Sequence, residues 1–301
     1  MATKSFEQAA VLGLYTETPL HCGAESGVGY VDLPVQRERH TRYPVIPGST
    51  LKGRLKDETD PKKGGKLGEK EHEAAFGSMN DQTRETKPGK ISFGDALLVA
   101  FPVRSADVPY RWATSPLALE RVGRLLGEKS WVGSPGEGEA WVRGAVDGGE
   151  VLLEEVVLTA VAKPERYEAG VLPLLLELLP DEEQGFGYTR EIFLGQLTIV
   201  PDAIFSELVE TGTDVITRIK LNALGTTVNL EGPKYDHLSA DDRKGNLFVE
   251  EVVPAETLFA AALRNGGGPV DELVAAIPAV LQLGGDETIG RGVCHVRRWR
   301  R

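Results

Sequence analysis

The stretch GYVDLPVQRERHTRYPVIPGSTLKGRLK, residues 29–56, concentrates positive charge in an otherwise acidic chain. From Pro34 to Lys56 it has six basic side chains and one acidic side chain, a net charge of +5, whereas the 301-residue chain has a formal net charge of −11. Overall acidity disfavours indiscriminate binding to nucleic acid, but screening over about 8 Å lets a clustered patch act at its own surface. The stretch therefore predicts a local anion-binding surface, with the lone carboxylate of Asp32 at its edge.

The second half of this stretch predicts a helix over residues 47–58. Ser49 or Thr50 is a suitable N-cap, and two leucines follow four residues apart. The free amides of a helix N-terminus beside Lys52 and Arg54 attract phosphate. Taken alone, however, this helix and the run RERHTR are both typical of solvated charged surfaces. They support each other only if the fold brings them to one groove.

Working outward, the apolar pattern predicts interleaved strands and helices without a 20–50-residue repeat, which favours an α/β or α+β fold with insertions. The charged, glycine-rich segment 57–90 predicts a mobile insertion with one helical turn. A polar stretch over 222–246 lies between two strand-like runs and predicts an arm that projects from a sheet. Strands are expected at 9–20, 90–103, 150–161, 194–200, 215–221, 246–254 and 288–301, and further helices at 114–128 (capped by Ser115), 171–180, 201–212 and 269–285.

Composition excludes several classes of protein. The chain is 41% hydrophobic and 26% charged, which is ordinary for a soluble globular protein. No apolar run approaches the roughly 18 residues of a membrane span, and the N-terminus lacks the pattern of a secretory signal. Cys22 and Cys294 are the only cysteines, too few for a disulfide framework or a cysteine-rich zinc site. We expect a cytoplasmic protein without a membrane partner.

The glycine-rich stretch LGGDETIGRG, residues 283–292, fails the common nucleotide-binding motifs. It lacks the lysine of a P-loop and the third glycine of a dinucleotide fingerprint, and it leads into a strand instead of a helix. Two interpretations stay open: a tight helix-to-strand turn, or a bare backbone whose amides meet phosphates.

Residues suited to catalysis are sparse. The five histidines lack metal-binding spacing, and no nucleophile elbow is present. Asp32 is either a turn aspartate before a proline or a functional carboxylate without a local partner. Glu250 and Glu251 are adjacent in a predicted strand, so at most one of them faces any given site. A two-metal site, which needs several acidic ligands, is not visible.

The order of these segments resembles a known family. The stretches GLYTETPLHCGAESGVGYVDLPVQRERHTRYPVIPGSTLKGRLK, FGDALLVAFPVRSADVPYRWATSPLALER and LFVEEVVPAETLF are similar to the backbone subunits of type III-B CRISPR (Cmr) effector complexes, and GGDETIGRG resembles the glycine-rich loop of their RAMP superfamily. The resemblance covers most of the chain, and the VDLPVQRERHT motif is the most specific part of it. Residues 57–71 and the stretch GPKYDHLSADDRKG match less well.

The resemblance implies a single α+β domain over residues 1–301, a ferredoxin-like or RRM-like palm with insertions and a protruding thumb hairpin at about 222–246. It implies copies stacked in a helical filament along a CRISPR RNA, together with other Cmr subunits. Each copy would cut complementary single-stranded target RNA at regular intervals with a divalent metal, Mg or Mn, as cofactor. The thumb would wedge into the guide–target duplex and splay one nucleotide at each step.

The resemblance also assigns residues. Asp32 matches the aspartate needed for cleavage and is a candidate metal ligand, with His21, Glu250 and Glu251 as candidate helpers. The residues expected to contact RNA are Arg37, Arg39, His40, Ser49, Lys52, Gly53, Arg54, Lys56, Thr226, Thr227, Gly284, Gly285, Thr288, Gly290, Arg291 and Gly292.

The expected reaction is attack by the target's 2′-hydroxyl on the adjacent phosphate, helped by in-line placement of a splayed nucleotide. Three alternatives stay open. The chain could be a structural guide-binding subunit without activity, or an endonuclease that processes CRISPR precursor RNA with His21 or His40 as base. A small-molecule nucleotide enzyme is the third, and the failed glycine motifs disfavour it.

Overall fold

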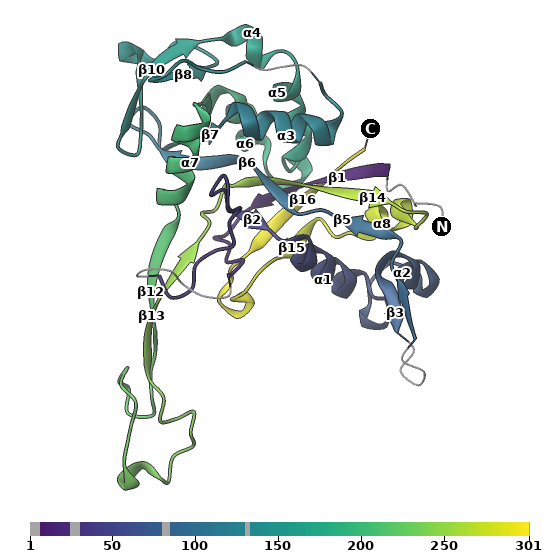
Figure 1. Ribbon diagram of the computed structural model, residues 1–301, viewed down its shortest axis with the longest axis vertical. Coiled ribbons are helices and arrows are strands. Elements are labelled where there is room, and N and C mark those ends of the chain that lie inside the picture. The colour runs from purple at the N-terminus through teal and green to yellow at the C-terminus, as the bar shows by residue number, and fades with distance from the viewer. Residues whose placement is uncertain (1–6, 25–30, 80–84, 130–132, 301) are drawn as a thin grey trace.

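Strand β1 (Glu7–Thr16) lies at the centre of the fold, between β14 (Leu258–Asn265) and β16 (Val293–Trp299), and is antiparallel to both. The computed structural model describes residues 7–24, 31–79, 85–129 and 133–300. Within them, one large mixed sheet has the order β15-β16-β1-β14-β6-β7-β11-β8-β10-β9, with β2 beside β6 and β5 beside β14 (Figure 1). The other strands of this sheet are β2 (Val45–Ile46), β5 (Ile91–Phe93), β6 (Ala96–Arg104), β7 (Tyr110–Thr114), β8 (Glu139–Val142), β9 (Glu150–Leu153), β10 (Val156–Ala162), β11 (Leu197–Ile199) and β15 (Val280–Gln282).

Helices cover both faces of this sheet. The side chains of α1, α2 and α8 join one hydrophobic cluster, whereas those of α5, α6 and the 3-10 helix η3 join a second cluster on the other face. The α-helices are α1 (Gly48–Thr59), α2 (Glu69–Phe76), α3 (Pro116–Leu126), α4 (Pro164–Tyr167), α5 (Val171–Leu174), α6 (Gly187–Gln196), α7 (Asp202–Thr211) and α8 (Val270–Ala276). The 3-10 helices are η1 (Pro61–Lys63), η2 (Asp147–Gly149), η3 (Leu175–Leu178), η4 (Glu182–Gln184), η5 (Pro233–Tyr235) and η6 (Glu287–Ile289).

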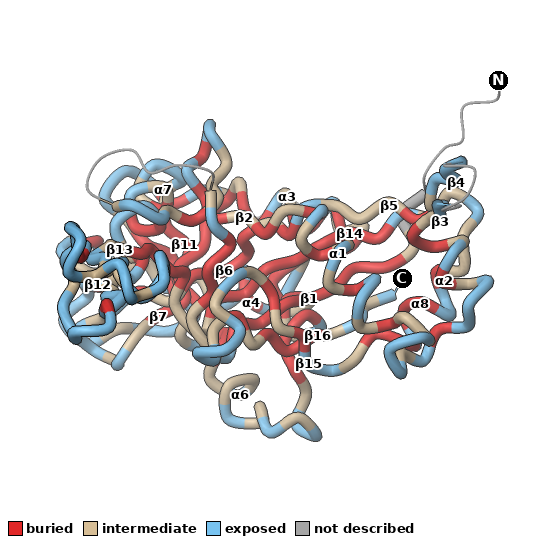
Figure 2. Tube along the Cα trace, turned by 90° about the horizontal axis from the view of Figure 1, so that it is seen from below, coloured by how far each residue is buried: buried red, intermediate tan, exposed pale blue. Residues whose placement is uncertain are grey.

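The residues of β1 alternate between the two clusters, because successive side chains of a strand point to opposite faces. Leu12 and Leu14 join the first cluster, and Val11 and Tyr15 join the second. Figure 2 shows the buried residues running through the body of the molecule. At Gly13 a Cβ would lie 2.1 Å from the carbonyl oxygen of Leu178, so the close approach of η3 to the strand requires a glycine.

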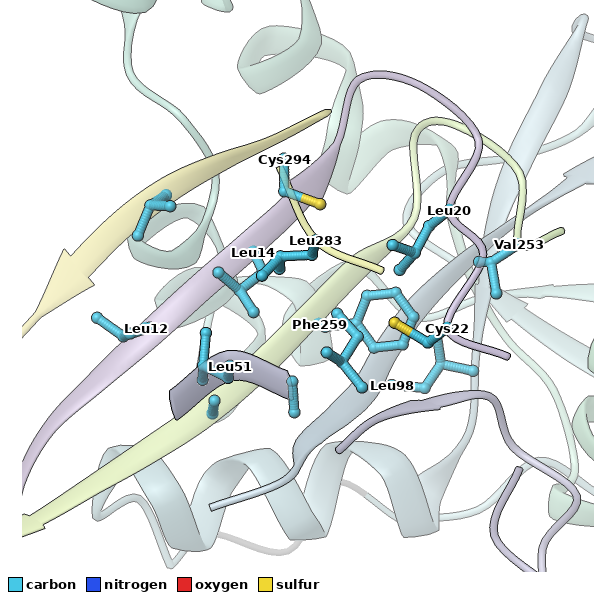
Figure 3. Close-up of a cluster of buried hydrophobic side chains, with 14 of the residues drawn as sticks. Leu12, Leu14, Leu20, Cys22, Leu51, Leu98, Val253, Phe259, Leu283 and Cys294 are labelled. Atoms are coloured by element: carbon cyan, nitrogen blue, oxygen red, sulfur yellow. The ribbon is translucent and has the colours of Figure 1, made fainter. Parts of the chain in front are cut away.

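Both cysteines lie in the first cluster as free thiols (Figure 3). Burial raises the pKa of the Cys22 thiol to about 12 and also raises the pKa of Cys294. A buried, un-ionised thiol is a poor nucleophile and a poor metal ligand, so these side chains act in packing.

The arm is a ribbon of β12 (Asp214–Lys220) and β13 (Asn246–Val252), which pair with each other and form a sheet separate from the main one. It projects away from the body, as Figure 1 shows, and residues 221–245 form its distal turns. This is the hairpin that the polar stretch between two strand-like runs predicted. Its exposed apolar side chains are Val215, Ile219, Leu221, Leu224, Val228 and Leu247.

Segment 57–90 contains more regular structure than predicted. Helix α2 spans two turns, and β3 (Gly77–Met79) pairs with β4 (Thr86–Pro88), while residues 80–84 lie outside the described part. The prediction of a single helical turn was wrong because Leu67, Ala75 and Phe76 are buried against the first cluster. The sequence pattern did not indicate that these side chains are buried, because charged residues surround them in the sequence.

Other boundaries were partly right. The helix expected at 114–128 is α3, and Ser115 Oγ accepts a hydrogen bond from the Ala118 amide at 3.3 Å, as expected of an N-cap. The strand expected at 150–161 is instead a hairpin, β9 and β10, which turns at Glu154 in the left-handed region. The helix expected at 269–285 ends at Ala276, and β15 follows it. None of the described helices is long and apolar enough to cross a bilayer.

Candidate active site and nucleic-acid interface

Asp32 is attached to the arm. Its amide and that of Leu33 donate hydrogen bonds to the Val249 carbonyl at 3.0 and 3.1 Å, and its Oδ2 accepts one from the Val249 amide at 2.8 Å. The Glu251 amide donates to the Leu33 carbonyl at 3.0 Å, so this segment runs as a short extra strand along β13. The carboxylate is exposed, and the structure shows no protein partner for its Oδ1 within the described residues. It is therefore free to meet a ligand from solvent.

A shallow hollow of about 260 Å³ opens beside this carboxylate. Its lining comes from the Asp32 segment and from the first residues of β13: Asp32, Leu33, Asn246, Leu247 and Phe248. An exposed carboxylate beside apolar and aromatic side chains is a surface on which a nucleotide's base and phosphate can both be contacted.

His21 reaches the other end of the same strand. Its Nδ1 lies 2.7 Å from the Glu251 carbonyl oxygen. Since a carbonyl oxygen can only accept a hydrogen bond, Nδ1 is the donor in this contact. Gly23 makes room for the ring, because a Cβ there would lie 2.8 Å from Nε2. The carbonyl oxygen of His21 also accepts a hydrogen bond from the Gly285 amide at 2.8 Å. His21 thus joins β13 to the glycine-rich loop.

Glu250 and Glu251 point to opposite sides of β13, as their adjacency predicted. Glu251 Oε1 lies 2.5 Å from Arg37 Nη2 and 2.7 Å from the Thr213 hydroxyl, and its Oε2 accepts from the Val35 amide at 2.9 Å. Burial alone would raise the pKa of Glu251, but the hydrogen bonds from Arg37 and Thr213 outweigh it and the pKa is lowered. This carboxylate is fully engaged in holding the fold.

Glu250 is buried on the other side of β13. Its carboxylate lies 3.1 Å from Arg218 Nη1, and His21 Nδ1 and Arg291 Nε are each 3.9 Å away. Arg218 is also 2.6 Å from Asp286 in the glycine-rich loop. Burial raises the pKa of Glu250, and the proximity of Asp286 raises it further. The pKa of Asp286 is lowered instead, by its hydrogen bond with Glu250 and by the Arg218 guanidinium.

Among the residues that the structure describes, Arg37 has several partners inside the protein. Besides Glu251, its guanidinium donates to the Arg42 carbonyl at 2.7 Å and to the Val209 carbonyl at 2.9 Å, and 9% of its side chain is exposed. These contacts satisfy the guanidinium inside the protein, so we leave Arg37 out of the proposed RNA-contacting set. Its position in the motif is explained by packing of the loop onto α7.

The rest of the run RERHTR is held on the body by ion pairs. Glu38 binds Arg121 of α3 at 2.5 and 2.8 Å, and Arg42 binds Glu210 of α7 at 2.9 Å. Arg39 and His40 lie at the exposed turn between these anchors. The net charge of the segment therefore overstates its free charge, because about half of its cations are neutralised within the protein.

The N-terminus of α1 is capped differently from the prediction. Helix α1 begins at Gly48, whose amide donates to Asp95 Oδ1 at 2.7 Å, so neither Ser49 nor Thr50 is the N-cap. Pro47 precedes the helix with an extended backbone, and its carbonyl accepts a hydrogen bond from the Leu51 amide. Within the described residues, the amides of Ser49 and Thr50 have no backbone acceptor, which leaves them available to an anion.

The exposed side of α1 carries the expected basic residues. Lys56 is exposed and Lys52 is half-buried, and no ion pair involves either within the described residues. Gly53 is exposed, and a Cβ there would meet no atom within 4 Å, so a ligand's backbone can approach the helix at this point. Arg54 instead binds Glu58 at 2.6 Å and Glu287 at 3.6 Å.

The contact between Arg54 and Glu287 places the glycine-rich loop beside α1. Two of its glycines are required by the loop itself: a Cβ at Gly284 would lie 2.2 Å from the His21 carbonyl oxygen, and one at Gly292 would lie 1.9 Å from the Leu283 carbonyl oxygen. The tight-turn interpretation therefore accounts for these two. Three further residues of the predicted set, Gly285, Thr288 and Gly290, are exposed, and Arg291 is half-buried.

Thr226 and Thr227 lie in the distal turns of the arm, away from the group around β13. Asn222 organises this turn, because its Nδ2 donates to Thr226 Oγ1 at 2.6 Å and its Oδ1 accepts from the Thr226 amide at 3.1 Å. Thr226 is exposed. The structure therefore attaches Asp32 and His21 to β13, the strand that carries Glu250, and separately joins α1 to the glycine-rich loop, while these threonines belong to a third region.

The described residues do not form a protein cage for a metal ion, since no group of three or more His, Cys, Asp or Glu side chains there is arranged to hold one. Of the three candidate carboxylates of this site, Asp32, Glu250 and Glu251, only Asp32 is exposed to solvent. A hard cation such as Mg²⁺ keeps several waters and often binds through one or two carboxylates together with substrate phosphates. The residues present therefore fit a cation that the RNA helps to hold.

The chain belongs to the RAMP superfamily, whose family model matches residues 14–295. This superfamily fits the single mixed sheet, the glycine-rich loop before the last strand and the protruding hairpin. Within this superfamily, the chain is similar to the CRISPR system Cmr endoribonuclease Cmr4 of Pyrococcus furiosus. The two sequences are 35% identical over 96% of this chain and 95% of that protein. A shorter match, 34% identical over 27% of this chain and 40% of the relative, is to the endoribonuclease Csm3 of Streptococcus thermophilus.

Solved structures agree with this assignment. The crystal structure of oligomeric Cmr4 from Pyrococcus furiosus superposes with a TM-score of 0.67 at 28% identity, covering 98% of this chain and all of that one. A chain of the type III-B Cmr-beta complex bound to cognate target RNA superposes with a TM-score of 0.66 at 20% identity, covering 97% and 98% of the two chains. The predicted α+β RAMP fold is confirmed.

Two residues of the site escaped the sequence analysis. Arg218 and Asp286 bind Glu250 and each other, yet neither stands in a motif. The available signal was weak: Arg218 is one of several polar residues in β12, and Asp286 follows a pair of glycines. Their meeting depends on the register of the arm, which pairs Arg218 with Phe248, and on the left-handed backbone of Asp286.

Proposed function

We propose that this chain is an endoribonuclease subunit of a type III-B CRISPR effector complex, which holds a guide RNA and cuts complementary single-stranded RNA. The observation that carries the proposal is the exposed Asp32 carboxylate, held on β13 beside His21 and Glu250 in a chain 35% identical to a Cmr endoribonuclease. The sites where each strand of RNA lies and the roles of single residues are part of the proposal.

The guide is held by α1 and the glycine-rich loop. The amides of Ser49 and Thr50, the ammonium groups of Lys52 and Lys56 and the bare backbone around Gly285 and Gly290 form one surface, since Arg54 and Glu287 join the two elements. These groups contact phosphate and sugar, and such contacts carry no base sequence. That suits a subunit that must accept many guide sequences. Arg39 and His40 extend the surface at the exposed turn.

The target strand passes over the hollow beside Asp32. There the 2′-oxygen of one nucleotide attacks the adjacent phosphorus while the bond from phosphorus to the 5′-oxygen of the next nucleotide breaks. The products are a 2′,3′-cyclic phosphate and a 5′-hydroxyl. Asp32 accepts the proton of the 2′-hydroxyl, and the leaving oxygen takes a proton from water. In-line placement supplies much of the acceleration, since well-oriented intramolecular reactions gain about 7–11 kcal/mol.

In the alternative role, Asp32 would hold a divalent cation, Mg or Mn, with its free carboxylate oxygen together with phosphate oxygens of the RNA, and water would accept the proton of the 2′-hydroxyl. When bound, such a cation neutralises charge that develops on the phosphate oxygens. Asp32 then orients the scissile linkage, His21 is fixed in place by the Glu251 carbonyl, and Glu250 contributes through its ion pair with Arg218.

The arm supplies the distortion that in-line attack needs. Its exposed apolar side chains, among them Ile219 and Leu247, form a surface suited to stacking against bases. Thr226 and Thr227 in the distal turns would contact the RNA backbone. Stacked copies of the chain along one guide, other Cmr subunits and a cytoplasmic location complete the proposal.

The test is the substitution Asp32→Asn, made in the assembled complex with its bound guide. The matched control is Asp271→Asn, an exposed aspartate of α8 whose carboxylate pairs with Arg300. We expect Asp32→Asn to keep guide content and target affinity and to lose cleavage, with the control unchanged. Product ends are then analysed for the 2′,3′-cyclic phosphate. Wild-type cleavage by Asp32→Asn refutes the catalytic role and leaves a guide-binding subunit, whereas 5′-phosphate ends refute attack by the 2′-hydroxyl.

A further inference from the structure

Arg218 connects three parts of the molecule through one guanidinium. It lies on β12, and its Nη1 is 3.1 Å from Glu250 of β13 and 2.6 Å from Asp286 of the glycine-rich loop. Its guanidinium also packs over the Phe248 ring, 5.4 Å from the centroid. Phe248 and Arg218 are opposite each other in the ribbon, and Phe248 lines the hollow beside Asp32.

The charged groups around the Arg218 guanidinium include the buried carboxylate of Glu250, which needs a cation close to it. Glu250 is 1% exposed at its side chain, and Arg218 is the cation closest to it, with Arg291 and His21 each at 3.9 Å. Two carboxylates close to one another repel unless a cation or a shared proton lies between them. Arg218 therefore reduces the repulsion between Glu250 and Asp286, which belong to two different elements.

The Asp32 segment depends on the same strand. Asp32 and Leu33 bind the Val249 backbone, and Val249 immediately precedes Glu250. Asp32 is thus fixed to β13, whereas the proposed guide-binding surface is fixed to the glycine-rich loop. Besides the hydrogen bond between Gly285 and His21, β13 is tied to that loop by the contacts of Arg218 with Glu250 and Asp286, and more distantly by Arg291 of the loop, 3.9 Å from Glu250.

We propose that Arg218 is a positioning residue for RNA cleavage: by binding Glu250 and Asp286 together, it sets the place of Asp32 relative to the strand held on the glycine-rich loop. This inference rests on the proposed function. Loss of the guanidinium lets the base of the arm move against the loop, so Asp32 and Phe248 shift away from the scissile linkage. A displacement of about 1 Å costs an active site up to about a hundredfold in rate.

The experiment uses the assembled complex and compares Arg218→Met, Arg218→Lys and Asp286→Asn with Arg124→Met. Arg124 is the matched control, since its ion pair with Glu120 is exposed on α3. Guide content, target affinity and single-turnover cleavage rate are measured for each. We expect Arg218→Met to bind guide and target normally and to cleave about 10–100-fold more slowly. Arg218 contacts both carboxylates through the single nitrogen Nη1, so Arg218→Lys, which keeps the positive charge on a compact ammonium, is expected to recover part of that rate.

Several results overturn the inference. One is cleavage by Arg218→Met within twofold of wild type. If Arg218→Met fails to bind guide or to assemble, the second variant, Asp286→Asn, tests the inference. Slow cleavage by an intact Asp286→Asn complex supports the positioning role. A normal cleavage rate or a loss of assembly in this variant contradicts it. Asp32→Asn run in parallel separates the two proposals. An inactive Asp32→Asn beside a fully active Arg218→Met removes the positioning role alone, whereas an active Asp32→Asn removes the function on which it rests.

Discussion

The buried ion pair between Arg37 and Glu251 gives a prediction about folding in a motif that looks like a nucleic-acid contact. The side chains of the two residues are 9% and 10% exposed, and their nearest charged atoms are 2.5 Å apart. The substitution Arg37→Met keeps the apolar stem and removes the guanidinium. It leaves the Glu251 carboxylate with the Thr213 hydroxyl and the Val35 amide only.

Removing one partner of a buried ion pair costs about 3–5 kcal/mol in free energy of unfolding, because the other charge stays buried without compensation. The sign of the pH dependence follows from the pKa of Glu251, which is lowered in the folded chain. In the wild type its contribution is present above the pKa of the unfolded chain and is lost as pH falls through the folded value. In Arg37→Met the guanidinium no longer offsets the burial of the Glu251 carboxylate, so the pKa of Glu251 in the folded chain rises. The loss in stability is therefore largest at neutral pH and shrinks on acidification.

The assay is urea unfolding of the isolated chain near pH 7 and near pH 4, followed by circular dichroism. Arg124→Met is the control, with an expected loss of about 0.5 kcal/mol or less, since its i,i+4 pair with Glu120 is exposed. The double variant Arg37→Met with Glu251→Gln is expected to recover part of the stability, because it removes the stranded charge. A loss below about 1 kcal/mol at both pH values contradicts the reasoning, as does an Arg37→Met chain of normal stability whose RNA binding has a reduced salt dependence.

Three other substitutions test the site. Asp95→Ala removes the acceptor of the Gly48 amide and is expected to lower the free energy of unfolding by about 1 kcal/mol, as a lost helix cap does; no change in urea unfolding would show that water replaces it. Gly292→Ala, where a Cβ would be 1.9 Å from a carbonyl oxygen, is expected to destabilise the chain more than Gly290→Ala, where it meets open space, although both have positive φ; equal thermal midpoints would contradict this. Lys52→Ala is expected to lower the salt slope of guide binding by about 0.9, equally for unrelated guide sequences; an unchanged slope measured by fluorescence anisotropy would remove Lys52 from the interface.

Local pattern predicted the parts of the fold that local sequence controls. The cap at Ser115 and the proline after it gave α3, and a polar stretch between two β-rich runs gave the arm. Both signals depend on neighbouring residues. The hairpin of β9 and β10 was read as one strand because its turn uses Glu154 with a φ of 52°, where a glycine or asparagine would have been the usual signal.

The site was harder to predict because its residues meet only through the tertiary fold. Asp32 and His21 reach β13 from the other end of the chain, and no periodicity links them to Glu250. The family resemblance named Asp32, but it did not indicate that Arg37 pairs with Glu251, nor that Arg218 joins two carboxylates. Charge counts in a sequence cannot separate a free cation from a paired one. Pairing depends on which surface a side chain faces.

The central position of β1 has a consequence for biosynthesis. This strand is made before β14 and β16, which occupy both of its hydrogen-bonding edges, with Val11 beside Trp299 and Leu12 beside Ala261. A growing polypeptide on the ribosome must therefore keep β1 without these partners until β14 and β16 have emerged. Contacts of such long sequence separation fold slowly, and a prematurely terminated product would display two open strand edges, a template for aggregation. Only finished copies would then be competent to associate with RNA.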